Sequence, residues 1–165
     1  MSDQARELVR RLDAVEKRLS TCAGAELAAG ALTAPDPPSG ERWEAGQVWA
    51  HIAEFIPYWL GEAAHVIEDG ALQPTRFGRT KSDPGRVAAI ERDRHSDRSL
   101  LWKRVAGDIV SLRAFLAGLD PAAWSARGLH STLGEMDLGH LVDEFLVGHL
   151  EQHADQLEGL ASTAL

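Results

Sequence analysis

Apolar residues recur at steps of three and four along four stretches of this 165-residue chain, which is the spacing of one face of an α-helix. The stretches cover residues 2–29, 44–69, 85–119 and 134–161. In the first stretch the apolar face consists of Leu8, Leu12, Val15 and Leu19. No stretch shows the sustained alternation that is typical of a β-strand. The pattern therefore predicts four helices.

Proline and glycine mark the connections between these helices. A proline-rich segment at residues 35–38 interrupts any helix after the first stretch, and Pro121 ends the third. The connection at residues 70–85 is rich in glycine, proline and arginine, and residues 122–133 form another irregular connection. Pro57 lies inside the second stretch, where the loss of a backbone hydrogen bond predicts a kink or a local irregularity.

Four helices that each carry an apolar face pack together as a bundle. The sequence therefore predicts an all-α fold, a four-helix bundle with long loops between the helices. Its length suits one domain that covers residues 1–165. The first half of the third helix is strongly charged, so we expect it to project from the body of the bundle.

Composition excludes several classes of protein. The chain is 44% hydrophobic and 25% charged, as in ordinary globular proteins, and its net charge is −8 without a basic stripe. Binding to nucleic acid requires neutralisation of phosphates, so no nucleic-acid partner is expected. No apolar run approaches the roughly 20 residues that span a bilayer. The absence of a signal-like segment and the single cysteine, Cys22, favour the cytoplasm.

Three histidines form the candidate site. His149 and His153 lie four residues apart in the last helix, so their side chains share one face, which also carries apolar residues. His51 lies on the apolar side of the second helix, and ligands on facing helices converge in the core of a bundle. Three neutral imidazoles leave an open coordination position on a divalent ion. The sequence thus predicts a metal site at His51, His149 and His153.

The sequence is also compatible with other assignments of these residues. A histidine pair at this spacing also arises by chance, and His51 is equally suited to a hydrogen-bonded place in the core. Glu54 and Glu144 are near the site in sequence and are candidate hydrogen-bond partners of the ligands, but a solvated surface carboxylate is the preferred interpretation of each. His130 is one further candidate neighbour of the site.

These residues carry a resemblance to a known family. The chain resembles the DinB/YfiT-like superfamily of metal-binding four-helix bundles in Trp43 before the second helix, in the Val-Trp-Ala-His element that ends at His51, and in the closing pair His149 and His153. The resemblance implies a histidine-only site for a divalent metal ion, usually zinc or nickel. It also implies thiol-dependent transfer or isomerisation, with mycothiol or bacillithiol as cosubstrate.

The function expected from residues and resemblance together is a metal-dependent thiol S-transferase that acts on a small-molecule substrate. The thiol or a water must come from solvent, because no local arrangement of serine, cysteine and histidine supplies a nucleophile. A metal-dependent hydrolase, a non-catalytic metal-binding or stress-response bundle, and a metal-free structural bundle are the alternatives. We also expect a homodimer, because Trp49 and Trp102 lie outside the main apolar faces.

Overall fold

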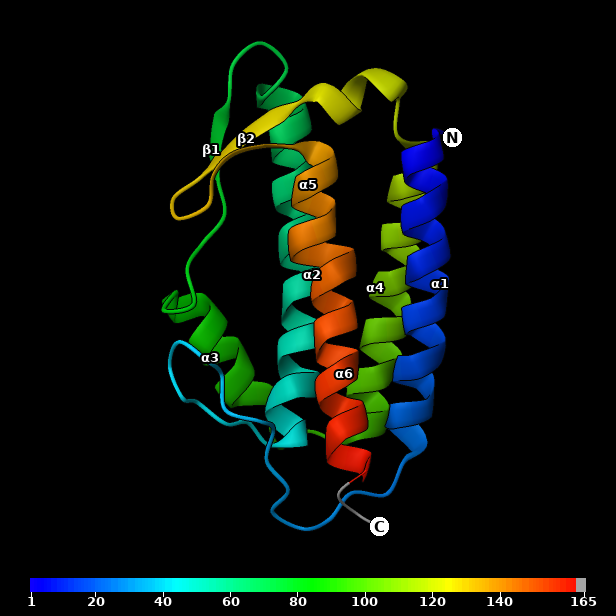
Figure 1. The fold of residues 1–165 in the computed structure, drawn as a ribbon, viewed down its shortest axis with the longest axis vertical. Coiled ribbons are helices and arrows are strands. Elements are labelled where there is room, and N and C mark those ends of the chain that lie inside the picture. Colours follow the sequence, from blue (N-terminus) through cyan, green and yellow to red (C-terminus); the bar gives the residue numbers. More distant parts are fainter. Residues whose placement is uncertain (163–165) are drawn as a thin grey trace.

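The four-helix bundle is confirmed by the computed structural model, which describes residues 1–162; the last three residues of the predicted domain lie outside this range. The long helices are α1 (Asp3–Gly24), α2 (Ala45–Asp69) and α4 (Arg98–Gly118). The fourth is built from α5 (Leu138–Val142), the π-helical turn η2 (Asp143–Val147) and α6 (Gly148–Ser162). In Figure 1 the four run side by side, and each of α1 and α2 packs against both α4 and α6.

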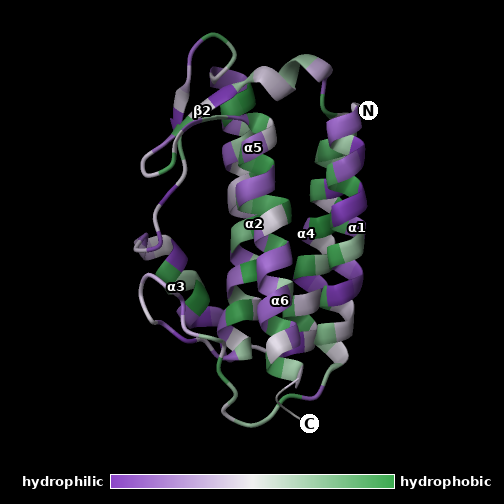
Figure 2. Cartoon of the chain, viewed as in Figure 1, coloured by the Kyte–Doolittle hydropathy of each residue, from purple (hydrophilic) through white to green (hydrophobic). Residues whose placement is uncertain are grey.

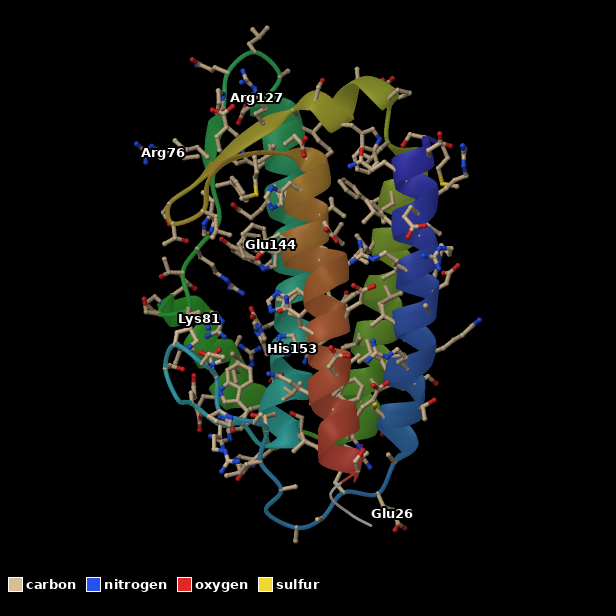
Figure 3. The ribbon with its side chains drawn as sticks, in the orientation of Figure 1. Glu26, Arg76, Lys81, Arg127, Glu144 and His153 are labelled. Atoms are coloured by element: carbon tan, nitrogen blue, oxygen red, sulfur yellow. The ribbon has the colours of Figure 1, made fainter. Side chains whose placement is uncertain are left out.

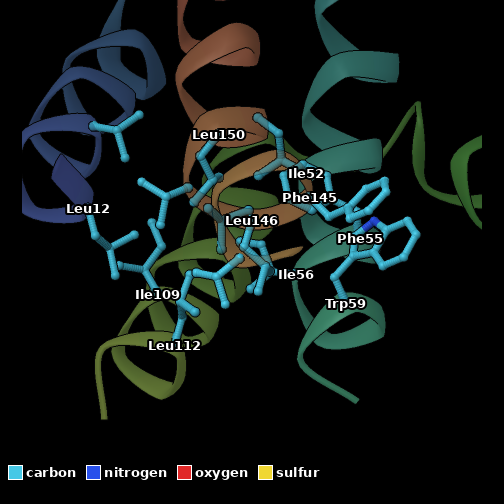
Figure 4. Close-up of a cluster of buried hydrophobic side chains, with 14 of the residues drawn as sticks. Leu12, Ile52, Phe55, Ile56, Trp59, Ile109, Leu112, Phe145, Leu146 and Leu150 are labelled. Carbon is cyan, nitrogen blue, oxygen red and sulfur yellow. The ribbon is translucent and has the colours of Figure 1, made fainter. Parts of the chain in front are cut away.

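The core lies along the axis of the bundle and receives side chains from every long helix. Hydrophobic residues concentrate on the inward faces of the helices (Figure 2), as their sequence periodicity requires. The close-up in Figure 4 shows one cluster of fully or largely buried side chains, which includes Leu12, Ile52, Ile56, Ile109, Leu112, Leu146 and Leu150. The bundle therefore buries a continuous core from its own apolar residues.

The prediction of one continuous third helix is wrong, because residues 85–119 contain two helices. The charged first half forms α3 (Pro84–Asp93), which packs against α2 outside the bundle, and α4 begins at Arg98. Asp97 separates them: its carboxylate accepts a hydrogen bond from the backbone N–H of Ser99 and caps α4. The helix periodicity continues across this cap, which is why the pattern alone did not reveal the break.

Two predicted loops contain short strands, which add a small sheet to the confirmed helical bundle. β1 (Thr75–Phe77), β2 (Arg127–His130) and β3 (Gly134–Asp137) form a small sheet in that order at one end of the bundle (Figure 1). β1 pairs with β2 in parallel, and β2 pairs with β3 as an antiparallel hairpin. Strands of three or four residues are too short to show alternation. A short 3₁₀ helix, η1 (Pro121–Ser125), leads into β2.

Two further expectations concern single residues. α2 is α-helical on both sides of Pro57, and the irregular turn of the bundle lies in η2. Trp49 is buried, and its ring lies 6.0 Å from that of Trp102 in an edge-to-face contact within the chain. Within residues 1–162 no helix is both long enough and apolar enough to cross a membrane.

Candidate metal centre

α2 supplies the first histidine of the site from the middle of its buried face. The side chain of His51 is only 4% exposed, and its Nδ1 lies 2.8 Å from Oε1 of Glu54, one helical turn further along. The ring of Phe55 lies beside that of His51 and stacks on that of His149, with 4.3 Å between the latter pair of centroids. The helix thus holds both the position and the orientation of the His51 ring.

The last helix supplies the other two histidines immediately after its π-helical turn. Gly148 donates its backbone N–H to the carbonyl of Asp143, five residues earlier, which defines the wider turn. A Cβ atom at residue 148 would lie 2.6 Å from that same oxygen, so only glycine fits here. The extra residue in the turn rotates everything after it by about 100° relative to a regular helix. This rotation aims His149 and His153 at α2.

The three histidines converge between α2 and α6. One ring nitrogen from each of His51, His149 and His153 lies within 4.8 Å of the other two. The ring of His51 is 5.2 Å from that of His149 and 4.9 Å from that of His153, between centroids. Zinc binds imidazole nitrogens at about 2.0–2.1 Å, so small rotations of these side chains suffice to bring all three around one ion.

Hydrogen bonds outside the cluster fix which nitrogen faces inward. Glu54 accepts from Nδ1–H of His51, and Oε1 of Gln156 lies 2.8 Å from Nδ1 of His153 and accepts in the same way. The Nε2 atoms of both rings are thereby left as lone-pair donors. Nε2 of His153 is fully buried and has no hydrogen-bond partner among the described residues. A buried nitrogen without a partner is costly, and a metal ion in the cluster would satisfy it.

Burial keeps the imidazoles neutral. Removal from water, and next the charge of the neighbouring His153, hold the pKa values of His51 and His149 well below the ordinary 6.5. Burial lowers the pKa of His153 to about 4, and a hydrogen bond to Gln156 opposes this. At neutral pH all three rings are therefore in the deprotonated form that ligates metals.

The preferred interpretation of Glu54 as a solvated carboxylate is wrong. Its side chain is 7% exposed and accepts hydrogen bonds from His51 and from Nη2 of Arg79, which is itself only 11% exposed. Burial raises the pKa of the Glu54 carboxyl group, while Arg79 acts in the opposite direction. Glu144 is exposed, as expected, and it lines the cavity described below.

A loop closes the side of the cluster opposite the core. Trp43 stacks on His153 with 6.4 Å between ring centroids and meets His51 edge-on at 5.4 Å. Two hydrogen bonds hold it there: Trp43 donates its backbone N–H to Oγ1 of Thr33, and its carbonyl accepts from the Thr33 backbone N–H. Thr33 is buried, so the two hydrogen bonds hold the Trp43 ring in place as one wall of the site.

Two cavities adjoin the cluster and share His51 and His149 as lining residues. The smaller, about 160 Å³, extends toward Trp43 and Gln156. The larger, about 650 Å³, has an apolar wall of Trp59 and Phe145. Its polar lining residues include Arg79, Lys81, Arg86, Glu144 and Gln152. In Figure 3, Glu144 and His153 lie toward the side of the bundle on which α3 and Lys81 are drawn.

The remaining histidines lie outside the cluster. His95 and His140 are exposed, and the ring of His65 pairs with Asp69 at 3.1 Å. His130 is buried and lines the larger cavity, where its Nδ1 accepts from the backbone N–H groups of Thr132 and Leu133. His130 therefore forms part of the wall of the larger cavity and does not join the cluster of three histidines.

The fold and the cluster together define a class: four-helix bundles that gather histidines between the second and the last helix beside an open cavity. This chain belongs to the DinB superfamily, whose sequence pattern it matches over residues 7–157. Comparison with curated proteins finds no similar sequence.

Solved structures with the same fold are distant in sequence. YfiT from Bacillus subtilis, described as a probable metal-dependent hydrolase with an unusual four-helix bundle topology, is 15% identical with a TM-score of 0.72, covering 99% of this chain and 90% of that one. A mutant of the mycothiol-dependent maleylpyruvate isomerase is 14% identical with a TM-score of 0.68, over 95% of this chain and 63% of that one. An uncharacterized protein from Clostridium difficile 630 is 7% identical with a TM-score of 0.66, over 100% and 99% of the two chains. Similarity at these identities establishes the fold alone.

Proposed function

We propose that this chain binds one divalent metal ion through His51, His149 and His153 and is a metal-dependent thiol S-transferase that uses a small thiol of the mycothiol type. The observation that supports metal binding is the cluster of three neutral rings, of which His51 and His153 are buried and His149 is half-buried, with Nε2 of His153 lacking any partner among residues 1–162. Imidazole suits zinc and nickel, which are the proposed metals. When bound, the ion supplies the Lewis acidity that makes a thiol or a water nucleophilic at neutral pH.

The protein's own residues then bind and orient the reactants. Trp59 and Phe145 provide an apolar surface for the electrophilic partner, and Trp43 covers the opposite side of the cluster. Cys22 is buried near the end of α1, does not line either cavity, and has its thiol pKa raised by burial. The nucleophile in this proposal therefore comes from solvent.

Metal-dependent hydrolysis is the second candidate, because YfiT, which shares the fold, is described as a probable metal-dependent hydrolase. The same residues would serve it, with water in place of the thiol. A non-catalytic metal-binding bundle would keep the site without either reaction.

Metal analysis and a thiol assay test the proposal. Untagged protein is analysed for zinc and nickel, and the zinc-loaded protein is then given a chlorobimane with mycothiol, bacillithiol or glutathione. His153→Ala is the site variant, and His140→Ala, an exposed histidine in the same helical segment, is the matched control. Acceleration by a thiol that His140→Ala keeps and His153→Ala loses supports the transferase. Ester hydrolysis without thiol favours the hydrolase, and bound metal with neither activity favours the non-catalytic bundle.

Three further expectations accompany this proposal: one domain, a cytoplasmic location and a homodimer. Trp49 and Trp102 pack on each other, so they do not supply the free surface on which the homodimer was predicted. The homodimer stays a prediction, and light scattering that gives a monomer mass at micromolar concentration would contradict it.

A further inference from the structure

Three cationic side chains line the larger cavity, and two of them are already paired. Arg79 bonds to Glu54, and Nζ of Lys81 lies 3.0 Å from Oδ2 of Asp36. Arg86 makes no ion pair with any carboxylate in residues 1–162. Among the three cations, Arg86 is therefore the one without a carboxylate at ion-pair distance.

Arg86 is held in a fixed position with part of its guanidinium free. It lies in the first turn of α3, where its backbone N–H donates to Oδ1 of Asp83, the N-cap residue. Nη1 donates to the Lys81 carbonyl at 2.8 Å, and no described residue accepts from Nε or Nη2. The guanidinium carbon lies 5.5 Å from the centre of the Trp43 ring. Such a group presents two adjacent donors, the geometry that binds a carboxylate in a bidentate way.

Arg86 lies beside the proposed metal centre. Arg86 lines both cavities, as do His51 and His149. Its positive charge contributes to the lowered pKa of all three histidines, and burial lowers the pKa of Arg86 itself. A partly desolvated cation without a partner is unfavourable, and an anion from solvent would relieve this cost.

We infer that Arg86 is the anion-binding residue of this cavity and that it pairs with a carboxylate on the small molecule that occupies it, beside His51 and His149. Its role in a reaction rests on the function proposed above, whereas the binding of a carboxylate does not. A carboxylate carries the single charge that balances Arg86. A phosphate dianion would in addition face Glu144 in the larger cavity and Asp36 and Glu41 in the smaller.

Three aromatic probes test this inference, because Trp59 and Phe145 suit an aryl group. Benzoate, benzamide and phenyl phosphate have similar shapes and differ in charge. Each is titrated by calorimetry and by ligand-observed NMR into the protein as purified, and again after treatment with a chelator. The variants are Arg86→Gln, Arg86→Lys and His153→Ala, and Arg76→Gln is the control because Arg76 is exposed and lines neither of the two cavities. Metal content and circular dichroism are measured on every sample.

The expected result is that benzoate binds more tightly than benzamide and phenyl phosphate. We expect Arg86→Gln to weaken benzoate about tenfold. Arg86→Lys should lose less, and Arg76→Gln should change little. Equal binding of benzoate and benzamide by the parent protein, no binding of benzoate, tighter binding of phenyl phosphate, or benzoate affinity that depends on His153 and not on Arg86 would each overturn the inference. The comparison of probes on the parent needs no variant, and missing metal in the purified protein counts against the proposed function alone.

Discussion

Replacing Glu54 with glutamine removes one negative charge from the candidate site and almost no volume. Its carboxylate holds two partners, Nδ1 of His51 at 2.8 Å and the buried guanidinium of Arg79. Loss of a hydrogen bond to a metal-ligating histidine typically lowers metal affinity by about 10- to 100-fold, or about 1.4–2.8 kcal/mol. The amide oxygen of glutamine still accepts from His51 but no longer increases the basicity of the ring. We therefore expect the zinc affinity of Glu54→Gln to fall by about tenfold or more.

The same change leaves Arg79 without its main counter-charge. Loss of one partner of a buried ion pair costs about 3–5 kcal/mol. Asp83, whose Oδ1 lies 3.8 Å from Nη1 of Arg79, retains part of the compensation. We expect Glu54→Gln to lose about 2–3 kcal/mol in free energy of unfolding without metal. The double variant Glu54→Gln/Arg79→Gln should recover much of that stability and none of the zinc affinity.

Two measurements separate these effects. Zinc affinity is obtained by competition with a chromophoric chelator, and stability by urea unfolding of the chelator-treated protein. Glu68→Gln, an exposed position in α2, is the control. A zinc affinity of Glu54→Gln within twofold of the parent would refute the argument that Glu54 tunes the His51 ligand. Recovery of that affinity in the double variant would show that the loss came from the unpaired arginine.

Four further predictions concern the histidines and the helix that carries two of them. His153→Ala should reduce bound zinc from one equivalent to nearly none with unchanged helical circular dichroism, whereas His140→Ala should keep the metal; an unfolded metal-free protein would contradict this. Gly148→Ala should cost about 1–3 kcal/mol and weaken zinc binding, because the added Cβ lies 2.6 Å from the Asp143 carbonyl; parent-like stability and affinity would show that η2 adapts. Zinc affinity should be nearly constant from about pH 8 to about pH 6 and fall toward pH 4, since the rings are already neutral, and a tenfold change above pH 6 would refute it. Over the same acid range the metal-free protein should lose stability as pH falls. Histidines in the unfolded chain bind protons below their ordinary pKa of 6.5, whereas the three rings in the folded protein do not. For His153, whose pKa in the folded protein is about 4, the loss in free energy of unfolding measured with urea reaches about 3 kcal/mol.

The bundle was predictable because each long helix carries its own apolar face. Hydrophobic periodicity missed the short strands and the break in the third helix, because these features span too few residues to show a repeating pattern. β1 and β2 have three and four residues and pair across about fifty positions of sequence, so neither carries a recognisable signal alone. The break before α4 depends on one capping residue, Asp97, within a continuous helical pattern.

The histidine cluster was also predictable, although the turn that aims it was not. Spacing alone places His149 and His153 on one face, but η2 decides where that face points. The signal was Gly148 in the middle of a predicted helix, where glycine is unfavourable without a special reason. Trp43 and Arg79 reach the site from predicted connections, and Arg86 reaches it from the charged start of the third predicted helix. Their convergence follows from tertiary packing, which periodicity does not describe.

The outer partners of the ligands follow a repeated spacing that sequence reasoning had the means to find. Glu54 lies three residues after His51, and Gln156 lies three residues after His153; each accepts from the Nδ1–H of its histidine on the same helix. Residues three apart on a helix are neighbours, so α2 and α6 each supply from their own sequence a hydrogen-bond partner that orients His51 or His153. Orientation of the rings therefore depends on helices that the apolar core already stabilises. This is why we expect the site to be formed before metal arrives, and why loss of the metal should leave the bundle folded.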